Sequence, residues 1–402
     1  MEFNYSDRLK NLGGNAIREI FKLLQDPEVI SFAGGFPTKS TLPTKLISDT
    51  TAELMASSEA ENILQYGSTE GYTPLRYTAV DYVKRYGIDN IDIDNTLIIS
   101  GGQQGIDLTF KTFVNKGDYV LVEDPTYLAV LHILKTYEGK PIGVKSGDDG
   151  LDLEDLEKKI IEYKPKVLYC VPTFSNPTGR TYSIEKRKAI AELTAKYNVM
   201  VLEDDPYSEL RFEGDRVPSI KSFDKVGNVI YITSFSKTLA PGLRTGIAIG
   251  DKEVIRKLTI GKQATDVHTC SLAQAIIDNF LRKGLMDNRL KELIPIYYEK
   301  KQAMIEAIKK YMPKEFKYTN PQGGLFIFGE FDKSLGINTL EVFKDVCMRK
   351  VAYVSGHSFF ASEDQFNTLR LNYSNASLEQ IDIGIKRLGE FFTELINSKN
   401  KK

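Results

Sequence analysis

Lys237 and the residues around it could together bind a phosphorylated carbonyl compound. Residues 229–233 are β-branched or aromatic, which is typical of a buried strand, and Lys237 lies just beyond their end. An amine in that place can form a Schiff base with a carbonyl cofactor. Ser234, Ser236 and Arg244 offer hydroxyl and guanidinium donors that could bind a phosphate. The alternative is an ordinary surface lysine, one of the 53 lysines and arginines of the chain.

Polar and aromatic side chains follow other apolar runs of the sequence. Asp204 comes just after the run 199–202, and a carboxylate there could keep a pyridine nitrogen protonated through a charge-assisted bond. Asn176 follows another run, where its amide could donate to a ring oxygen. Tyr127 follows a third run, where its ring could face a planar heterocycle. The alternatives are a helix-capping acid, a turn and a core aromatic residue.

Two further features could bind anions. The segment 100–105, Ser-Gly-Gly-Gln-Gln-Gly, should open a helix, where small residues let backbone N–H groups approach an anion. It matches neither a Walker A loop nor the Gly-x-Gly-x-x-Gly fingerprint, so a tight turn without a ligand is the alternative. Arg370 lies within an apolar run, where an unpaired cation is costly. It therefore needs either a substrate carboxylate or a structural salt bridge.

The spacing of the apolar runs predicts an α/β fold with a mostly parallel, seven-stranded sheet. The runs alternate with helical segments near 104–114, 126–137, 151–163 and 183–196. Strands that are apolar throughout are covered on both faces, and ligands of such sheets lie beyond the carboxyl ends of the strands. The chemically interesting residues fall at those ends. The predicted strands are 97–100, 119–122, 142–144, 167–171, 199–202, 229–233 and 246–249.

The two ends of the chain are expected to form a smaller α+β domain. A helical stretch over 252–312, with a break near Gly284, leads into a region of mixed strands and helices. A predicted helix over 15–25 should share a face with that region. The predicted division is 1–45 for the N-terminal helix and arm, 46–290 for the large cofactor-binding domain, and 291–402 for the C-terminal small domain.

The composition is that of a soluble globular protein. Hydrophobic residues make up 42% of the 402 residues and the net charge is −1, so nothing favours nucleic acid or a membrane as partner. Three scattered cysteines and three scattered histidines give neither a disulfide framework nor a zinc site. No secretory signal and no membrane-spanning run is visible. We therefore predict a cytoplasmic protein without a metal.

The ordered set of motifs resembles the fold-type I aminotransferases of class I and II, which use pyridoxal 5′-phosphate (PLP). It is most similar to the 2-aminoadipate/kynurenine aminotransferase branch, over essentially the whole chain. The same branch supplies the catalytic domain of GntR-type (MocR-like) regulators. The motifs are Ile17-Arg-Glu-Ile, Ser31-Phe-Ala-Gly-Gly-Phe-Pro, Leu64-Gln-Tyr-Gly, Gly102-Gln-Gln, Asn176-Pro-Thr-Gly, Glu203-Asp-Asp-Pro-Tyr, Ser234-Phe-Ser-Lys and Thr368-Leu-Arg-Leu.

The resemblance implies a role in cofactor binding for most of these residues. Lys237 would form the Schiff base and carry protons, Asp204 would pair with the pyridine nitrogen, and Tyr127 would stack on the ring. Asp204 is preferred to Asp205, which would point to the opposite face of a continuing strand. Asn176 and Tyr207 would hydrogen-bond the phenolic oxygen. The phosphate would be held by Gly102 (often serine in this branch), Gln103, Ser234 and Arg244, with Ser236 close by.

Four residues would bind the substrate or connect two subunits. Arg370 and Asn176 would bind the substrate α-carboxylate, with Gly35 lining the pocket. Tyr66 would reach the phosphate of the neighbouring subunit, which implies a homodimer with composite active sites. Arg18 matches a position that recognises a distal carboxylate in this branch, the alternative being an exposed helix charge.

The implied reaction is a ping-pong transamination through a Schiff base on Lys237. An L-amino acid would be the donor, with 2-aminoadipate, kynurenine or aromatic amino acids expected, and a 2-oxo acid, expected to be 2-oxoglutarate, the acceptor. β-Elimination or decarboxylation on the same fold stays open, because the outcome depends on which Cα bond lies perpendicular to the ring. A MocR-like effector domain is a further alternative, and would need a DNA-binding domain in addition to this chain.

Overall fold

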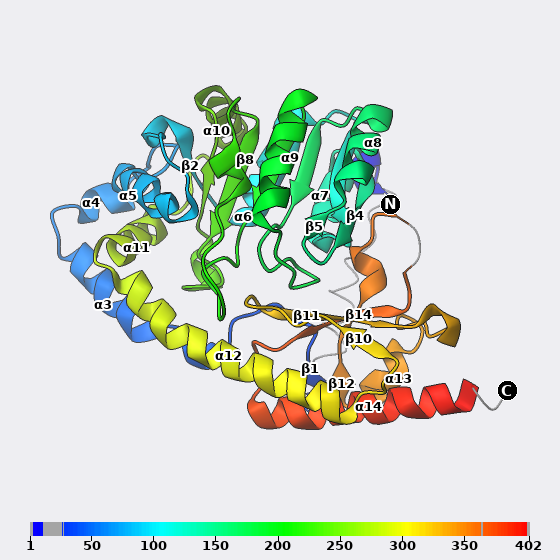
Figure 1. The fold of residues 1–402 in the computed structure, drawn as a ribbon. Coiled ribbons are helices and arrows are strands. Elements are labelled where there is room, and N and C mark those ends of the chain that lie inside the picture. The colour runs from blue at the N-terminus through cyan, green and yellow to red at the C-terminus, as the bar shows by residue number, and fades with distance from the viewer. Residues whose placement is uncertain (1–2, 11–25, 27, 363–364, 400–402) are drawn as a thin grey trace.

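The structure is a computed structural model that describes residues 3–10, 26, 28–362 and 365–399. In the view of Figure 1 a large sheet with its helices lies above a smaller lobe built from the C-terminal third of the chain. The predicted helix over 15–25, and Arg18 with it, lies outside the described residues.

The large sheet has eight strands in the order β2-β9-β8-β7-β6-β3-β4-β5. The five strands from β8 to β4 run parallel, whereas β9 is antiparallel to both of its neighbours and β5 is antiparallel to β4. The predicted mostly parallel sheet is present with one strand more than predicted, because β5 is too short to leave an apolar run. The strands are β2 (Thr96–Ile99), β3 (Tyr119–Asp124), β4 (Lys140–Gly147), β5 (Gly150–Leu151), β6 (Val167–Cys170), β7 (Met200–Asp204), β8 (Val229–Ser234) and β9 (Gly246–Ile249).

Helices cover both faces of this sheet, which explains why its strands are apolar throughout. Val120 and Val122 of β3 pack into one hydrophobic core with the helices α6 and α7, while Leu121 packs into another with α8 and α9. Fully burying each such side chain contributes roughly 1.5–3 kcal/mol relative to exposure. The covering helices are α6 (Gly102–Phe113), α7 (Leu128–Thr136), α8 (Leu153–Tyr163), α9 (Ile184–Lys196) and α10 (Lys252–Asp266).

The way these helices begin differs in one respect that matters for the site. Asp152, Ser183 and Asp251 cap α8, α9 and α10 with their side chains, which accept hydrogen bonds from first-turn N–H groups. Helix α6 begins after Gly101 and has no side-chain cap. The Gln104 N–H donates back to the Gly101 carbonyl oxygen at 3.0 Å, whereas the N–H groups of Gly102 and Gln103 can face an anion.

The smaller lobe contains a four-stranded antiparallel sheet in the order β10-β11-β14-β13. Its two long helices, α12 and α14, run along the bottom of Figure 1 and pack on that sheet. The N-terminal strand β1 pairs in parallel with β12 of this lobe. The strands are β1 (Ile30–Ser31), β10 (Phe316–Tyr318), β11 (Phe326–Phe331), β12 (Val351–Ala352), β13 (Val354–Ser355) and β14 (Thr368–Asn372).

The predicted long helical stretch is interrupted twice, at 267–270 and at Gly284, which takes a left-handed conformation before α12. The predicted domain boundaries, 1–45, 46–290 and 291–402, stay a prediction. The described part of the chain has no helix that is both long enough and apolar enough to cross a bilayer. The remaining helices are α1 (Asp7–Lys10), α3 (Thr44–Met55), α4 (Ala60–Leu64), α5 (Thr73–Val83), α11 (Ser271–Arg282), α12 (Leu285–Tyr311), α13 (Phe343–Met348) and α14 (Leu378–Lys399).

Candidate active site

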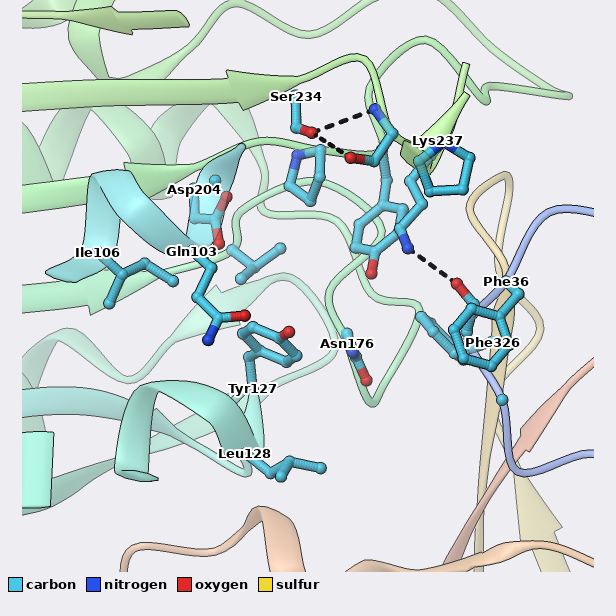
Figure 2. A pocket seen from close by; sticks show the side chains of 18 of the residues that line it. Phe36, Gln103, Ile106, Tyr127, Leu128, Asn176, Asp204, Ser234, Lys237 and Phe326 are labelled. Atoms are coloured by element: carbon cyan, nitrogen blue, oxygen red, sulfur yellow. Dashed lines mark hydrogen bonds between the residues drawn. The ribbon is translucent and has the colours of Figure 1, made fainter. Parts of the chain in front are cut away.

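A cavity of about 350 Å³ lies where the carboxyl ends of the parallel strands face the smaller lobe (Figure 2). Strands β7 and β8 and the loop after β6 contribute to it, as do the start of α6, the N-terminal segment near residue 35 and strands β11 and β14. Of the predicted site residues that the structure describes, it brings together all except Tyr66. Those it unites are Gly35, Gly102, Gln103, Tyr127, Asn176, Asp204, Tyr207, Ser234, Ser236, Lys237, Arg244 and Arg370.

Lys237 projects into the cavity from the segment that follows β8. Its Nζ donates to the carbonyl oxygen of Gly35 at 2.8 Å, across the cavity (Figure 2). Burial, together with the positive charges of Arg244 and Arg370, lowers the pKa of Lys237 to about 8, although Asp204 acts in the opposite direction. An amine with that pKa is partly neutral near neutral pH, which both nucleophilic attack and proton transfer require.

Asp204 ends β7 and turns its carboxylate into the same cavity. The Tyr169 hydroxyl donates to Asp204 Oδ2 at 2.8 Å. Burial raises the pKa of Asp204 to about 7, while that hydrogen bond lowers it and the neighbouring Asp205 raises it. Asp205 does not line the cavity, and its carboxylate accepts instead from the hydroxyls of Tyr231, at 3.0 Å, and Ser208. A buried carboxylate such as Asp204 would gain much from a cation placed beside it.

Other residues lining the cavity provide donors suited to a phosphate. Arg244 directs Nη2 to the carbonyl oxygen of Ser100 at 3.2 Å and Nη1 to Ser236 Oγ at 3.4 Å. Ser234 Oγ and Ser236 Oγ lie 2.9 Å apart. Gly101 has a φ of +86°, and a Cβ built there would lie 2.5 Å from Arg244 Nη2, so only glycine allows this approach. The uncapped start of α6 adds backbone donors at the same place.

Tyr127, Asn176 and Tyr207 also line the cavity. Tyr127 precedes α7, and Figure 2 shows its ring beside Gln103. Asn176 makes a hydrogen bond with the Tyr207 hydroxyl. Burial raises the pKa of both tyrosines, so both hydroxyls stay protonated at neutral pH and can donate. A planar ring between these groups would meet an aromatic face and a pair of hydrogen-bonding side chains.

Arg370 lies on β14 and is only 3% exposed. Its Nη1 donates to Asn176 Oδ1 at 2.8 Å and its Nη2 to the carbonyl oxygen of Ala33 at 2.5 Å. The guanidinium lies over the rings of Phe326 and Phe359, and burial lowers its pKa to about 10. Its Nε has no hydrogen-bond partner among the described residues, and none of their carboxylates pairs with it. The structural salt bridge considered as an alternative is therefore not found in this part of the chain.

Comparison with known proteins decides the family. The family described as "Aminotransferase class I and II" matches residues 27–388. The chain belongs to this family. It is 38% identical to aromatic-amino-acid aminotransferase 1 of Thermococcus litoralis, over 97% of this chain and 94% of the relative. It is 36% identical to 2-aminoadipate transaminase of Thermus thermophilus, over 95% and 94% of the two chains.

Solved structures agree with this assignment. The crystal structure of Pyrococcus horikoshii kynurenine aminotransferase in complex with PMP matches this aminotransferase with a TM-score of 0.92 and 40% identity, over 97% of each chain. The predicted fold-type I architecture and transaminase class are thereby confirmed. Because the family depends on PLP for its chemistry, the predicted cofactor is confirmed with it.

The residues of this aminotransferase supply the groups that PLP needs. The Gly101–Gly102 turn offers backbone donors for a phosphate beside Arg244. The buried Asp204 carboxylate borders the same turn, with Oδ1 3.6 Å from where a Cβ of residue 102 would be, and it has no ion-pair partner among the described residues. Lys237 lines the same cavity. The cavity therefore combines anion-binding donors, a buried carboxylate that a cation could pair with, and an amine.

One predicted residue, Tyr66, lies outside the cavity, and several lining residues had no signal in the sequence. Tyr66 is 82% exposed and packs its ring edge-on against His268, outside the cavity. Arg18 lies outside the described residues. Apolar lining residues such as Leu128 and Phe326 look like ordinary core positions in the sequence, and Tyr169 is hidden within an apolar strand. The lining residues that were not predicted are Ala33, Gly34, Phe36, Ile106, Leu128, Val171, Pro206, Pro241 and Phe326.

Proposed function

We propose that this aminotransferase transfers the amino group of an L-amino acid to a 2-oxo acid in a ping-pong reaction at Lys237. The observation that carries the proposal is the position of Lys237, which shares one cavity with the Asp204 carboxylate and the donors of Arg244, Ser234 and Ser236. When bound, PLP supplies a carbonyl carbon for the amine and a ring that withdraws electrons from the substrate's Cα.

Lys237 acts as the proton carrier of the reaction. Its pKa of about 8 means that Nζ can take up a proton and release it again near neutral pH. Nζ already reaches across the cavity to Gly35, so the side chain spans the space where the substrate's Cα must lie. Lys237→Ala should therefore abolish transamination, while the fold remains.

Asp204 and the phosphate-facing residues hold the cofactor by its two ends. Asp204, ionised, would accept a charge-assisted hydrogen bond from a protonated ring nitrogen and thereby keep that nitrogen charged. Gly102, Gln103, Ser234, Ser236 and Arg244 would hold the phosphate. Tyr127 would cover one face of the ring, and Asn176 and Tyr207 would hydrogen-bond its phenolic oxygen. This division of roles rests on the resemblance to the family and on the presence of all these residues in one cavity.

Arg370 and Asn176 orient the substrate by its α-carboxylate. Arg370 has an unpartnered Nε and no carboxylate partner among the described residues, so it is the buried cation that an incoming carboxylate would neutralise. Binding there would direct the Cα–H bond toward Lys237. Gly35 lies close by, and a larger side chain at that position would contact the Phe326 ring.

The donor is proposed to be an aromatic amino acid, kynurenine or 2-aminoadipate, with 2-oxoglutarate as acceptor. Two features support this choice: the names of the relatives, and the apolar wall that Phe36, Leu128 and Phe326 form along the cavity. Arg18 is proposed to recognise a distal carboxylate. Comparing Arg18→Ala on 2-aminoadipate and on phenylalanine tests this role, which requires a loss on the acidic donor alone.

A homodimer with composite active sites is proposed from the exposed Tyr66. The Tyr66 ring is 82% exposed and its neighbour Leu64 is 70% exposed, so both are available to a second subunit. Tyr66 would then reach the phosphate of the partner site. Mixing Tyr66→Ala with Lys237→Ala protein tests this, because mixed dimers would contain one intact site and regain activity. A cytoplasmic location stays a prediction from the three free cysteines.

An amino-donor panel with 2-oxoglutarate tests the proposed reaction directly. We expect glutamate to form in step with consumption of an aromatic, kynurenine or 2-aminoadipate donor. Release of ammonia or CO₂ in place of glutamate would instead assign β-elimination or decarboxylation to the same site.

A further inference from the structure

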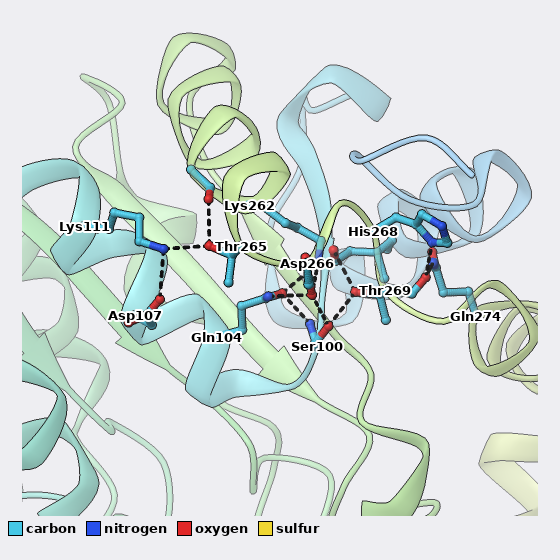
Figure 3. Close-up of polar contacts among 12 residues, drawn as sticks. Ser100, Gln104, Asp107, Lys111, Lys262, Thr265, Asp266, His268, Thr269 and Gln274 are labelled. Atoms are coloured by element: carbon cyan, nitrogen blue, oxygen red, sulfur yellow. Dashed lines mark hydrogen bonds and ion pairs between the residues drawn. The ribbon is translucent and has the colours of Figure 1, made fainter. Parts of the chain in front are cut away.

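A second polar cluster, with one buried lysine at its centre, adjoins the turn 100–103 (Figure 3). Its centre is Lys262 of α10, which is fully buried. Lys262 Nζ lies 2.8 and 2.9 Å from the two carboxylate oxygens of Asp266, one helical turn further on, and 2.8 Å from Gln104 Oε1 of α6. Gln104 Nε2 in turn donates to Asp266 Oδ2 at 2.7 Å. The three side chains form a closed ring of interactions between two helices.

This cluster holds the turn through Ser100, the residue between β2 and the two glycines. The Ser100 N–H donates to Gln104 Oε1 at 2.7 Å, and its hydroxyl donates to Asp266 Oδ2 at 2.8 Å. The carbonyl oxygen of Ser100 accepts from Arg244 Nη2 on the cavity side. Ser100 is therefore held on one side by the cluster and on the cavity side by Arg244, a proposed phosphate ligand.

Neighbouring glutamines of α6 face in different directions. Gln103 lines the cavity, whereas Gln104 does not and has both ends of its amide engaged in the cluster. Without that amide, the N–H of Ser100 and the ammonium of Lys262 would both lose an acceptor in a partly buried place. Gly101 and Gly102 have no side chains of their own with which to fix the turn.

Stability alone gives little reason to bury Lys262. Burial lowers the pKa of its ammonium, and the pairing with Asp266 acts against that shift. Replacing a buried ion pair by apolar side chains of similar volume is often neutral or stabilising, so such a pair is weak evidence for a stabilising role. Instead, the cluster orients the turn, because four of its hydrogen bonds involve Ser100 or Gln104, which flank the two glycines.

We propose that Lys262, Gln104 and Asp266 are positioning residues that fix the turn 100–103 in the shape that binds the cofactor's phosphate. None of the three lines the cavity, so they act through Ser100 and the glycines. The inference rests on the proposed cofactor site at Lys237.

The test compares two ligands that differ only in the phosphate. PLP and pyridoxal are each titrated into full-length protein stripped of cofactor, and the dissociation constants are measured for wild type and Lys262→Met. We expect the variant to lose about tenfold or more in affinity for PLP and less than about twofold for pyridoxal. Inorganic phosphate should also compete less well with PLP in the variant.

Lys221→Met is the matched control. Lys221 forms a similar pair with Asp224 at 2.7 Å, with side chains 10% and 1% exposed, and neither residue lines the cavity. It should leave the ratio of the two dissociation constants at the wild-type value even if it lowers the thermal midpoint. If Lys262→Met does not fold, Gln104→Met is measured instead and is expected to give the same selective loss.

Equal losses for PLP and pyridoxal, or no loss for either, would overturn the positioning role. Failure of the proposed function gives a different result, since the wild-type protein itself would then bind PLP no better than pyridoxal. A selective loss in the Lys221→Met control would also count against the inference.

Discussion

Replacing Tyr169 by phenylalanine removes a single hydrogen bond to the Asp204 carboxylate. The Tyr169 hydroxyl donates to Asp204 Oδ2 at 2.8 Å, and both side chains are buried. Phenylalanine fills nearly the same volume, so the core around β6 should be kept. The variant therefore isolates the effect of one donor on the group that is proposed to hold the ring nitrogen.

The size of the effect follows from the hydrogen bond and the burial. A hydrogen bond to a charged group contributes about 1.5–3 kcal/mol, which corresponds to about one to two pKa units. Burial already raises the pKa of Asp204 to about 7 in spite of that bond. Because the donor favours the ionised carboxylate, its loss raises the pKa further, and the fraction ionised at neutral pH falls by roughly tenfold.

The assay is the affinity of the cofactor-free protein for PLP, measured from weakly acidic to alkaline pH. Tyr169→Phe should bind PLP about tenfold more weakly near neutral pH, and the difference from wild type should shrink at alkaline pH as Asp204 ionises without its donor. Tyr231→Phe is the matched control, because its hydroxyl donates to Asp205, which does not line the cavity. A Tyr169→Phe deficit that is the same at every pH, or that Tyr231→Phe reproduces, would refute the reasoning.

Two further predictions concern Arg370 and Glu123. Arg370→Met should lower kcat/KM for the amino acid about 30-fold or more, because a carboxylate would then be buried without its partner, while PLP affinity stays near wild type; an unchanged KM would remove the carboxylate role. Glu123 accepts from Val171 N–H and from the hydroxyls of Ser175 and Tyr182 under the loop that carries Asn176, and burial raises its pKa to about 8 from an ordinary 4.5. Because the pKa of Glu123 is higher in the folded than in the unfolded protein, the stability that Glu123 contributes is fully present below its ordinary pKa. That stability is lost as the pH rises through the folded-state pKa. Between pH 4.5 and 8, the free energy of unfolding of wild type, measured with denaturant, should therefore fall by about 1 kcal/mol or more relative to that of Glu123→Gln. Parallel dependence of the two free energies on pH would contradict this.

The sheet could be predicted from the sequence because its strands are buried on both faces. Runs such as 167–171 and 229–233 are apolar throughout, and the structure has strands β6 and β8 there. The two-residue strand β5 has no such run. It is held by antiparallel pairing to β4, which only the folded chain makes visible.

Site residues that directly follow a strand could be predicted from the sequence. Residues whose role depends on contacts with residues far along the chain could not. Asp204 and Asp205 are adjacent in sequence, strand alternation predicts opposite directions for their side chains, and Asp204 lines the cavity whereas Asp205 does not. Tyr169 looks like a core residue in an apolar run, because the carboxylate it contacts is 35 residues away. Lys262 meets Gln104 across 158 residues, a pairing that helix packing alone creates. The place of Tyr66 in a composite site depends on a second subunit and stays a prediction.

The central claim is that Lys237 is the residue to which the cofactor binds covalently. Reduction of the PLP-loaded protein with borohydride, followed by proteolysis and mass spectrometry, would fix the cofactor on its lysine and identify that lysine. We predict a phosphopyridoxyl group on Lys237 in wild type and none at any lysine in Lys237→Ala. A modification on another lysine, or an unmodified Lys237 in protein saturated with PLP, would contradict the account.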